Sequence, residues 1–556
     1  MTEQQEEFDF IVSGAGSAGC VVAARLSESG KYTVLLLEAG PEDKAFWIGV
    51  PLGFPKLFTD PAVNWMLETE PVPELNGRRI YQPRGKVLGG TSSINGMVYI
   101  RGHAQDYDLW RQRGCVGWSY EDVLPYFKMA EDQQRGADPY HGVGGPLTVS
   151  DQPVRCELTK AMVEAAQQAG IPYTPDFNGA RQEGVGFYQT TTRKNRRLNT
   201  ARAYLRPARR RRNLRIVTGA HATRVLLEER RATGIEYRTR AGLLTARARR
   251  EVILAGGAFG SPHLLQLSGI GPAFHLREFG IAPKVDLPHV GANLMDHFQA
   301  AMTFRCTKAI TVNDMVNSWH RRIAAGVEYV LFKRGPLATN GVHAGIFTRA
   351  DPEHERPNIQ INTTVWSIGG LNSRGPMPHP FPAFTMVPVL LNPCVSGTVR
   401  LRSPDPLAAP KISQNFLYER RDIETMIAAV RIVRSIVRQP ALAPYVAGEI
   451  APGVEARSDA EIEGYLRASG TANLHPVGSC RMGTDDAAVV DPRLRVRGIH
   501  GLRVADASIM PTLPAGNTNA PSIMIGEKAS AMILEDARAS SPLGLAAASC
   551  EQAAGT

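Results

Sequence analysis

The amino-acid sequence predicts an α/β fold with a doubly wound parallel sheet, and three observations support this prediction. Residues 8–38 alternate apolar, strand-like runs with a segment whose apolar residues have helical spacing. Two further glycine-rich stretches, residues 84–102 and 253–271, are typical of loops that place the backbone against a ligand. The length of 556 residues is enough for a large core divided over two or more lobes.

The first segment contains "FDFIVSGAGSAGCVVAARL", in which a GxGxxG pattern lies between a predicted strand and a predicted helix. Gly14 permits a tight turn, Gly16 lets the backbone approach a pyrophosphate, and Gly19 lets the helix pack on the strand. The helix then presents its partly positive amino terminus to the phosphates. Glu38 ends the second strand, where a carboxylate accepts hydrogen bonds from a ribose diol. These residues predict an adenine dinucleotide site.

The two later glycine-rich stretches are expected at the same ligand. "RGKVLGGTSSINGMVYIRG" combines glycines and hydroxyl residues with little bulk, and the Asn95 amide is suited to a ring edge or a ribityl chain. In "ILAGGAFGSPHLLQLSGIG" an apolar strand is followed by a helix for which Ser261 is the expected cap and Pro262 the first position. The amino terminus of this helix is expected to face the same crevice.

Charge and composition argue against several other classes of protein. The net charge is +10, and the densest basic stretch, residues 193–216, has neither an aromatic row nor a nucleic-acid motif, so we expect no nucleic-acid partner. We expect a solvated helix face leading into the strand "NLRIVTGA", with attraction for an acidic substrate or surface as the alternative. The seven cysteines are widely spaced without a CxxC pair and the histidines lack ligand spacing, so we expect no metal.

The two ends of the sequence lead to further expectations. No apolar run reaches the roughly 18 to 20 residues needed to cross a bilayer, and the amino terminus "MTEQQEEFDF" is acidic, unlike a signal peptide. We therefore expect a cytoplasmic protein with no transmembrane segment. The last segment, "ASSPLGLAAASCEQAAGT", is of low complexity and is expected to be disordered.

Five ordered motifs carry a resemblance to one family. They are "GKVLGGTSSINGMVYIRG", "GSPHLLQLSGIG", "VGANLMDH", "HPVGSCRMG" and "DPRLRVRGIHGLRVADASIMPTLPAGNTNAPSIMIGE". From about residue 8 to about residue 534 the chain resembles the glucose-methanol-choline (GMC) oxidoreductases, in particular their choline and alcohol dehydrogenase-like branch. The resemblance implies FAD as the cofactor. It also implies a doubly wound, Rossmann-like FAD-binding lobe that is interleaved with a substrate lobe built on an antiparallel sheet.

The same resemblance implies domains that are discontinuous along the chain. The FAD-binding domain is expected at 1–155, 198–310 and 470–536, the substrate-binding domain at 156–197 and 311–469, and a disordered tail at 537–556. The middle region is rich in proline and has short β-prone runs such as "NIQINTTVW", which agrees with strands and long loops.

Residue by residue, the resemblance implies a set of cofactor contacts. The expected positions are Gly14, Gly16, Ser17, Ala18, Gly19, Glu38, Ala39, Arg84, Val87, Gly89, Gly90, Thr91, Asn95, Gly96, Met97, Val98, Val225, Ala255, Gly256, Asp506, Ala507, Asn517 and Thr518. Val225 is expected to hold the adenine through its backbone. Some members attach FAD through a histidine that aligns with Ile94, so we expect a non-covalent FAD here.

His475, in "TANLHPVGSCRMG", aligns with the family's catalytic histidine, and Asn519 aligns with its second catalytic position. Oxidation of an alcohol removes a hydroxyl proton and a hydride, so it needs a base and a donor for the developing alkoxide. Imidazole suits the base because its pKa of about 6.5 is near working pH, and an amide donates without competing for the proton. Asn517 is an alternative for part of this work. The hydride is expected to pass to the flavin N5 atom.

Substrate and electron acceptor are less sharply indicated. In choline-oxidising relatives an acid follows a "TN" segment where this sequence has His343, so we expect a primary alcohol other than choline, with His343 and Trp366 as substrate residues and Phe381 and Phe384 as further candidates. We expect an FAD-dependent alcohol dehydrogenase; an oxidase that uses oxygen is the runner-up. The acceptor stays open between a quinone, an electron-transfer protein and oxygen, and so does homo-oligomerisation. A hydroxynitrile lyase-like activity or a flavin-binding protein without turnover are the alternatives from other classes.

Overall fold

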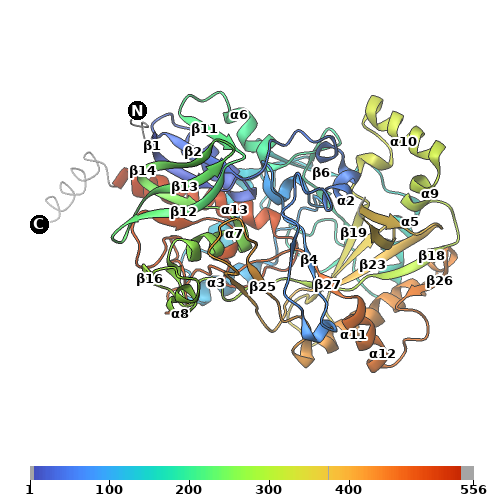
Figure 1. Cartoon of the computed structure of the whole chain (residues 1–556). Coiled ribbons are helices and arrows are strands. Elements are labelled where there is room, and N and C mark those ends of the chain that lie inside the picture. The colour runs from blue at the N-terminus through green and yellow to red at the C-terminus, as the bar shows by residue number, and fades with distance from the viewer. Residues whose placement is uncertain (1–5, 373–374, 540–556) are drawn as a thin grey trace, which may run out of the picture.

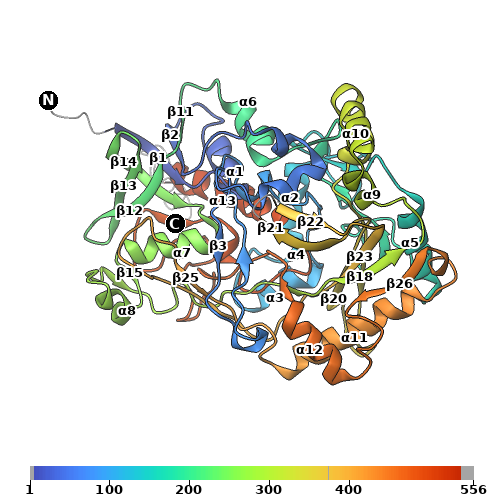
Figure 2. The ribbon, with the colours of Figure 1, turned by 45° about the vertical axis from the view of Figure 1, so that its right-hand side comes forward.

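The computed structural model of the protein describes residues 6–372 and 375–539. Within these residues the chain builds two lobes, one around a seven-stranded sheet and the other around an eight-stranded sheet. The two lobes lie side by side in Figures 1 and 2. The predicted α/β fold, with a doubly wound lobe next to a lobe on an antiparallel sheet, is confirmed.

The first sheet is parallel in its centre and antiparallel at one edge. Its order is β11-β2-β1-β14-β13-β12, and β28 pairs with β14. The strands are β1 (Glu6–Ser13), β2 (Val34–Glu38), β11 (Leu214–Thr218), β12 (His221–Glu228), β13 (Arg231–Thr239), β14 (Gly242–Leu254) and β28 (Leu502–Val504). Every residue of β2 is buried, because a central parallel strand is enclosed on both faces and therefore reads as an apolar run.

Two helices from opposite ends of the sequence pack together beside this sheet. They are α1 (Ser17–Leu26) and α13 (Asn519–Ala539), and α4 (Tyr120–Ala130) packs against α13. Glu527 of α13 is buried and accepts hydrogen bonds from Arg25 of α1 at 2.7 Å and from Tyr204 at 2.8 Å. A buried carboxylate with these partners ties the last helix to the first.

The second sheet is antiparallel and has the order β26-β18-β23-β20-β19-β7, with β17 and β27 at one side. Its strands are β7 (Gly184–Phe187), β17 (Phe298–Gln299), β18 (Met302–Cys306), β19 (Val342–Thr348), β20 (Ile359–Thr364), β23 (Ala383–Leu390), β26 (Val446–Ala451) and β27 (Thr471–Ala472). Helices α5 (Glu157–Gln168) and α11 (Arg420–Val437) cover it, α11 through apolar residues spaced by three and four, and α12 (Asp459–Ser469) packs against α11.

The remaining elements are short and connect the two lobes or decorate them. The helices are α2 (Phe54–Leu57), α3 (Ala104–Gln112), α6 (Arg206–Ala208), α7 (Gly257–Leu267), α8 (Ala273–Glu278), α9 (Val312–Asn317) and α10 (Trp319–Phe332). The strands are β3 (Leu67–Glu68), β4 (Tyr81–Gln82), β5 (Glu131–Gln133), β6 (Leu147–Asp151), β8 (Gln189–Thr190), β9 (Thr192–Arg193), β10 (Arg196–Arg197), β15 (Ile270–Gly271), β16 (Val285–Asp286), β21 (Ile368–Asn372), β22 (Gly375–Pro378), β24 (Thr398–Arg400) and β25 (Lys411–Ser413).

Three expectations about local structure need correction. Residues 298–306 and 471–472, which the sequence placed in the FAD-binding domain, form β17, β18 and β27 of the antiparallel sheet because they find their strand partners there. The basic stretch 193–216 is only partly helical: it starts as the β9–β10 hairpin, and the helical turns Ala201–Leu205 and Arg206–Ala208 then lead into β11 as expected. Helix α13 continues through Ala539, past the start of the predicted tail, and 540–556 lie outside the described residues.

Helix α7 begins at Gly257, four residues before the predicted cap Ser261, and includes Pro262 in its interior. Proline cannot donate to the carbonyl four residues earlier. The Ala258 carbonyl accepts the Ser479 hydroxyl at 2.5 Å instead. The Ser261 hydroxyl donates to Asp506 at 2.5 Å, so this serine ties the helix to a late segment of the chain.

Among residues 6–372 and 375–539, no helix combines the length and the apolar character that a membrane span requires.

The contact between α1 and the glycine turn generates a test of the fold. A Cβ atom added at Gly19 would lie 1.9 Å from the Gly14 carbonyl oxygen, so Gly19→Ala must displace the backbone. We expect it to lower the free energy of unfolding by about 1 to 3 kcal/mol and to weaken dinucleotide binding, measured by chemical denaturation and by bound-cofactor absorbance. Gly464→Ala is the control: that glycine is exposed on α12 with no atom near its Cβ position, and alanine should add about 0.5 to 1 kcal/mol. Equal stability of both variants would refute this packing.

Candidate active site

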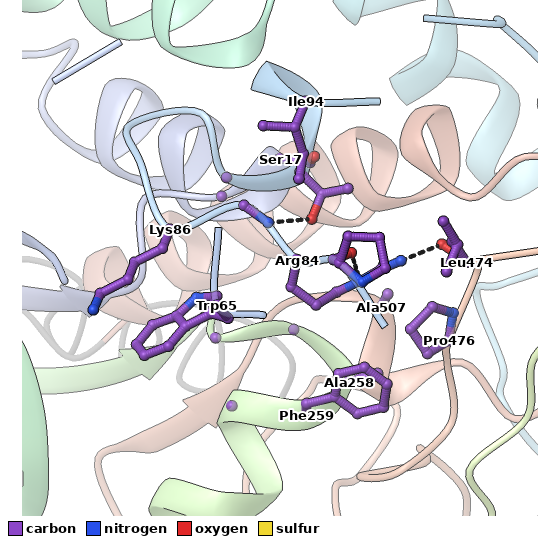
Figure 3. A pocket seen from close by; sticks show the side chains of 18 of the residues that line it. Ser17, Trp65, Arg84, Lys86, Ile94, Ala258, Phe259, Leu474, Pro476 and Ala507 are labelled. Atoms are coloured by element: carbon purple, nitrogen blue, oxygen red, sulfur yellow. Dashed lines mark hydrogen bonds between the residues drawn. The ribbon is translucent and has the colours of Figure 1, made fainter. Parts of the chain in front are cut away.

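A cavity of about 690 Å³ lies between the two lobes. One wall comes from α1, α7 and the start of α13, and the other from the antiparallel sheet through Gln299, Val342, Asn362 and Val387. Figure 3 shows part of this lining, with Arg84 reaching across toward Leu474. Both lobes therefore contribute to one enclosed site.

Three helix amino termini meet at this cavity, those of α1, α7 and α13. The Ser17 hydroxyl at the start of α1 donates to the Asn519 side-chain oxygen at the start of α13, at 2.8 Å. The unpaired backbone N–H groups at such termini carry partial positive charge and attract phosphate. The cavity thus has a built-in region for an anionic group.

The glycine turn between β1 and α1 gives the backbone access to the cavity. Gly14 has φ of +103°, a conformation that favours glycine. The segment after β4 crosses directly over this turn, because a Cβ at Gly90 would lie 2.6 Å from the Gly16 Cα. Around Gly16 itself the nearest atom to a Cβ position is the Ala255 oxygen at 3.9 Å. The Gly16 backbone is therefore open to a ligand.

Glu38 lies at the carboxyl end of β2 and lines the cavity. Its carboxylate accepts the backbone N–H of Ala15 at 3.0 Å and that of Gly40 at 2.8 Å. Burial raises the pKa of Glu38 to about 7 in the absence of a ligand. A pair of ribose hydroxyls would supply further donors to these oxygens, which matches the role predicted from its position.

The segment 95–98 forms another side of the cavity. The Asn95 side-chain oxygen accepts from the Arg197 guanidinium at 2.8 Å and from the Met97 backbone N–H at 3.0 Å. Met97 has φ of +62°. The Asn95 side chain thus ties this turn to Arg197 and to its own backbone. The turn therefore presents a fixed backbone surface to a flat ligand.

These features fit FAD. The glycine turn and the helix amino termini suit its pyrophosphate, Glu38 suits its ribose, and the 95–98 segment lines the same cavity as His475. Gly96, Gly257 and Gly260 line the cavity with no protein atom within 4 Å of their Cβ positions. The lining thus leaves space where a large planar cofactor would lie.

His475 stands on a loop that is fixed by two long-range contacts. The backbone N–H of His475 donates to Asp296 at 2.7 Å, and the Arg84 guanidinium donates to the Leu474 carbonyl at 2.7 Å. Leu474 has φ of +67°, a strained conformation for a residue with a side chain. Burial raises the pKa of Asp296 to about 7 and lowers that of Arg84 to about 10. The loop therefore holds the imidazole in a defined place.

The imidazole of His475 has a polar neighbour at each ring nitrogen. Its Nε2 lies 3.0 Å from the Asn517 amide nitrogen. Its Nδ1 lies 3.0 Å from His297 Nδ1 and 3.3 Å from the Asn473 amide nitrogen. Removal from water, together with His297 and Arg84, holds the pKa of His475 well below its usual range. The ring is thus neutral and able to accept a proton.

The prediction that Asn519 partners His475 is wrong. Asn519 is the first residue of α13 and its side-chain oxygen is engaged by Ser17, whereas Asn517 contacts the imidazole. The two asparagines are only two residues apart, but the start of the helix turns their side chains in different directions. From the sequence, Asn517 is predicted to contact the cofactor and to take only part of the catalytic work.

The predicted substrate residue His343 and the predicted adenine contact Val225 are not in the lining of the cavity. His343 is buried in the sheet, where its ring nitrogens lie 3.1 Å from the Thr159 hydroxyl and 3.0 Å from the Thr339 hydroxyl, and burial lowers its pKa to about 4. Neighbouring strand residues point to opposite faces, so Val342 lines the cavity in its place. The backbone N–H of Val225 donates to Ser268 at 2.8 Å. His221 and Ala222 line the cavity instead.

Most of the other predicted cofactor positions do line the cavity. They are Gly14, Gly16, Ser17, Ala18, Glu38, Ala39, Arg84, Gly90, Thr91, Asn95, Gly96, Met97, Val98, Ala255, Gly256, Asp506, Ala507, Asn517 and Thr518. Gly19, Val87 and Gly89 lie behind this lining: Gly89 donates its N–H to Ala15, and Val87 is in a small core. They support the cavity and do not face it.

Sequence analysis missed the residues that hold His475. His297 contacts its ring, Asp296 accepts its backbone N–H, and Asn473 is a third neighbour. The motif "VGANLMDH" contains Asp296 and His297 and belongs to the family pattern, so it is the feature of the sequence that could have indicated these two residues. The motif does not indicate that they contact His475.

One end of the cavity is aromatic. Phe54 packs edge-on against Trp366, with ring centroids 6.1 Å apart, and against Phe58 at 5.6 Å. All three line the cavity, so the prediction for Trp366 agrees with its position. Phe384 is instead buried against Phe304, and Phe381 stacks on His379. Neither of these two lines the cavity.

The charged groups of the cavity are few. Of the described residues in its lining, Glu38 and Asp506 are the carboxylates. Asp506 is engaged by the hydroxyls of Ser261 and Ser508 and by the Gly257 N–H. Among the described residues, no three His, Cys, Asp or Glu side chains gather in a way that would hold a metal ion.

The sequence of this chain is similar to those of known flavoenzymes. Two family models described as GMC oxidoreductase match residues 8–299 and 393–526. An oxygen-dependent choline dehydrogenase of Vibrio vulnificus is 41% identical over 539 residues, which is 95% of each chain. An alcohol dehydrogenase (acceptor) of Pseudomonas putida is 42% identical over 530 residues, which is 95% of this chain and 96% of that protein.

Solved structures show the same fold. Pyridoxine 4-oxidase from "Mesorbium loti" superposes with a TM-score of 0.85 at 32% identity, covering 94% of this chain and 98% of that one. A formate oxidase from Aspergillus oryzae RIB40, in a study of FAD modification, has a TM-score of 0.90 at 28% identity, covering 96% and 99%.

Proposed function

Since the chain belongs to the GMC oxidoreductase family and is an FAD-dependent enzyme that oxidises alcohols, we propose that it converts a primary alcohol to the aldehyde with His475 as the base. The observation that carries this proposal is the position of the His475 imidazole at the cavity, where its Nε2 atom lies 3.0 Å from the Asn517 amide nitrogen. A base and a hydrogen-bond donor side by side are what the loss of a hydroxyl proton needs.

The contacts of His475 indicate which nitrogen is the base. Burial lowers the pKa of His297 to about 3, so that ring is neutral and its Nδ1 is able to accept a hydrogen bond. We assign the His475 proton to Nδ1, directed at His297 Nδ1 at 3.0 Å, which is nearer to that nitrogen than the Asn473 amide nitrogen at 3.3 Å. The lone pair on Nε2 then faces the Asn517 amide, which only donates. In this tautomer Nε2 takes the hydroxyl proton of the substrate.

Asn517 would serve the substrate oxygen. Its amide nitrogen carries two hydrogens and its side-chain oxygen is buried without a protein partner. One N–H directed at the substrate oxygen would stabilise the negative charge that grows as the proton leaves. FAD, when bound, accepts the hydride. The protein would hold the substrate carbon next to the imidazole and the amide, which line the same cavity.

The aromatic end of the cavity supports a substrate with an uncharged apolar or aromatic body. Phe54, Phe58 and Trp366 supply apolar surface there. The two carboxylates of the lining, Glu38 and Asp506, are engaged by other groups, so a quaternary ammonium would lack an opposite charge. Several relatives are named choline dehydrogenases, and choline is therefore the competitor to test.

We propose that the FAD is held without a covalent bond. Ile94, at the position that aligns with the linking histidine of some relatives, lines the cavity and carries no nucleophile. Acid precipitation of the holoenzyme should therefore leave the yellow colour in the supernatant, because nothing but non-covalent contacts is broken. A yellow pellet after washing in denaturant would show a covalent link and refute this part of the proposal.

The reaction itself is tested by anaerobic flavin reduction. The purified holoenzyme is mixed with aliphatic, benzylic and furanic primary alcohols and with choline, and bleaching of the flavin band is followed. We expect bleaching by at least one uncharged alcohol at a rate well above that with choline. Readmitted oxygen or an added quinone then separates an oxidase from a dehydrogenase. Cleavage of a cyanohydrin without bleaching by any alcohol would instead indicate the lyase reaction.

The roles of the two polar residues are tested by substitution. His475→Ala should lower the rate of flavin reduction by about two to four powers of ten with FAD still bound, and added imidazole should restore part of it. Asn517→Ala should cost about one to three powers of ten. Asn519→Ala is the matched control, since its side chain contacts Ser17 and not His475. A loss in Asn519→Ala as large as that in Asn517→Ala would overturn the assignment.

A further inference from the structure

Helix α10 exposes an apolar face to solvent. Trp319, Ile323, Val327 and Leu331 recur every four residues, and Val330 lies beside them, so they form one stripe. Trp319 is 68% exposed and Leu331 is 65% exposed, and the other three are more than half exposed. Helices of soluble proteins usually direct such a stripe at the core. On α10 the stripe of five apolar residues is exposed, whereas only two residues of the helix are buried.

The inward side of α10 is narrow. Ala325 and Tyr329 are its buried residues. The Tyr329 hydroxyl donates to the Gly49 carbonyl at 3.0 Å and lies 3.3 Å from the Asn195 carbonyl. Asn195 in turn donates to the Lys333 carbonyl at 2.9 Å. These contacts fasten α10 to the β9–β10 hairpin while its apolar stripe stays free.

Exposed basic side chains lie on α10 and on the hairpin that α10 contacts. The exposed cations are Arg193, Lys194 and Arg196 on the β9–β10 hairpin and Arg321, Arg322 and Arg334 on or next to α10. Within the described part of the chain none of these six forms an ion pair, and the acid that α10 carries is Glu328. The basic stretch noted in the sequence thus contributes to this face.

Further exposed apolar residues lie on neighbouring elements. Phe46 and Trp47, 64% and 39% exposed, are on the 3-10 turn Phe46–Gly49, which contacts β10. Helix α9 links α10 to strand β22, where Met377 is 43% exposed. Figures 1 and 2 both show α10 projecting from the upper edge of the second lobe. We call α10, the β9–β10 hairpin and residues 46–47 the α10 face.

We propose that the α10 face docks on the surface of an anionic phospholipid bilayer. A helix with an aromatic and aliphatic stripe flanked by arginine and lysine is suited to lie in the membrane interface, with its apolar side chains among the acyl chains. The cations would contact lipid phosphates, and each gains from the negative surface potential. A second copy of the chain fits less well, because a twofold contact would oppose two sets of unpaired cations.

The test is co-sedimentation of the FAD-loaded, full-length enzyme with lipid vesicles. Vesicles of phosphatidylcholine with about one third phosphatidylglycerol are compared with phosphatidylcholine alone, at about 0.05 M and about 0.5 M salt. We expect about tenfold more protein to sediment with the anionic vesicles at low salt, and a smaller difference at high salt.

Two variants separate the contributions of the face. Ile323→Glu with Leu331→Glu should lower vesicle binding at least about tenfold, because charge is placed in the apolar stripe. Arg193→Gln with Lys194→Gln should lower binding to anionic vesicles and reduce its salt dependence. Phe274→Glu is the matched control: Phe274 is 77% exposed on α8, at the far end of the molecule in Figure 1. All variants should keep the wild-type rate of flavin reduction, which reports intact folding.

Three results would overturn the proposal. The first is absence of sedimentation with anionic vesicles, and the second is equal binding by the Ile323→Glu, Leu331→Glu variant. The third is a dimer in vesicle-free solution, measured by light scattering, that this variant dissociates while no vesicle binding occurs. That last outcome would assign the face to a second copy of the chain.

Discussion

The structure depends on a close approach of backbones at the glycine turn after β1. Gly14 lies against Ala255, Gly19 lies against the Gly14 carbonyl, and Gly90 lies against Gly16. Three segments that are distant in the sequence can meet there only because no side chain separates them. Their meeting sets the floor of the cavity and directs the amino termini of α1 and α7 into it. A dinucleotide site follows from this packing.

The second constraint is the way in which His475 is held. Arg84 from the cofactor segment and Asp296 from the strand-forming region fix its loop, and His297 and Asn517 fix its ring. Asp296 and His297 are buried, whereas Arg84, His475 and Asn517 are part-buried at the cavity. Burial of the imidazole lowers the pKa of His475, and an unsatisfied polar atom in such a place is costly. The His475 imidazole is therefore positioned by residues of both lobes, and the cavity is formed between them.

The α10 face lies at the edge of the same assembly. Short elements connect it to α2, whose Phe54 lines the aromatic end of the cavity. The helix is fastened by a few hydrogen bonds to residues that also carry the basic hairpin. Its apolar stripe is exposed and does not contribute to the packing of the lobes. Such an exposed apolar patch is typical of a surface that binds a partner.

The sequence by itself determined the doubly wound lobe, the glycine turn, and the positions of Glu38 and His475 at the cavity, because these depend on local spacing and on motifs read along the chain. Tertiary structure decided which side chains meet. The start of α13 selects Asn517 over Asn519, the alternation of β19 selects Val342 over His343, and strand pairing moves residues 298–306 to the second sheet. In each case the direction of a side chain or the partner of a strand is set by elements far away in the sequence, and spacing alone does not contain that information.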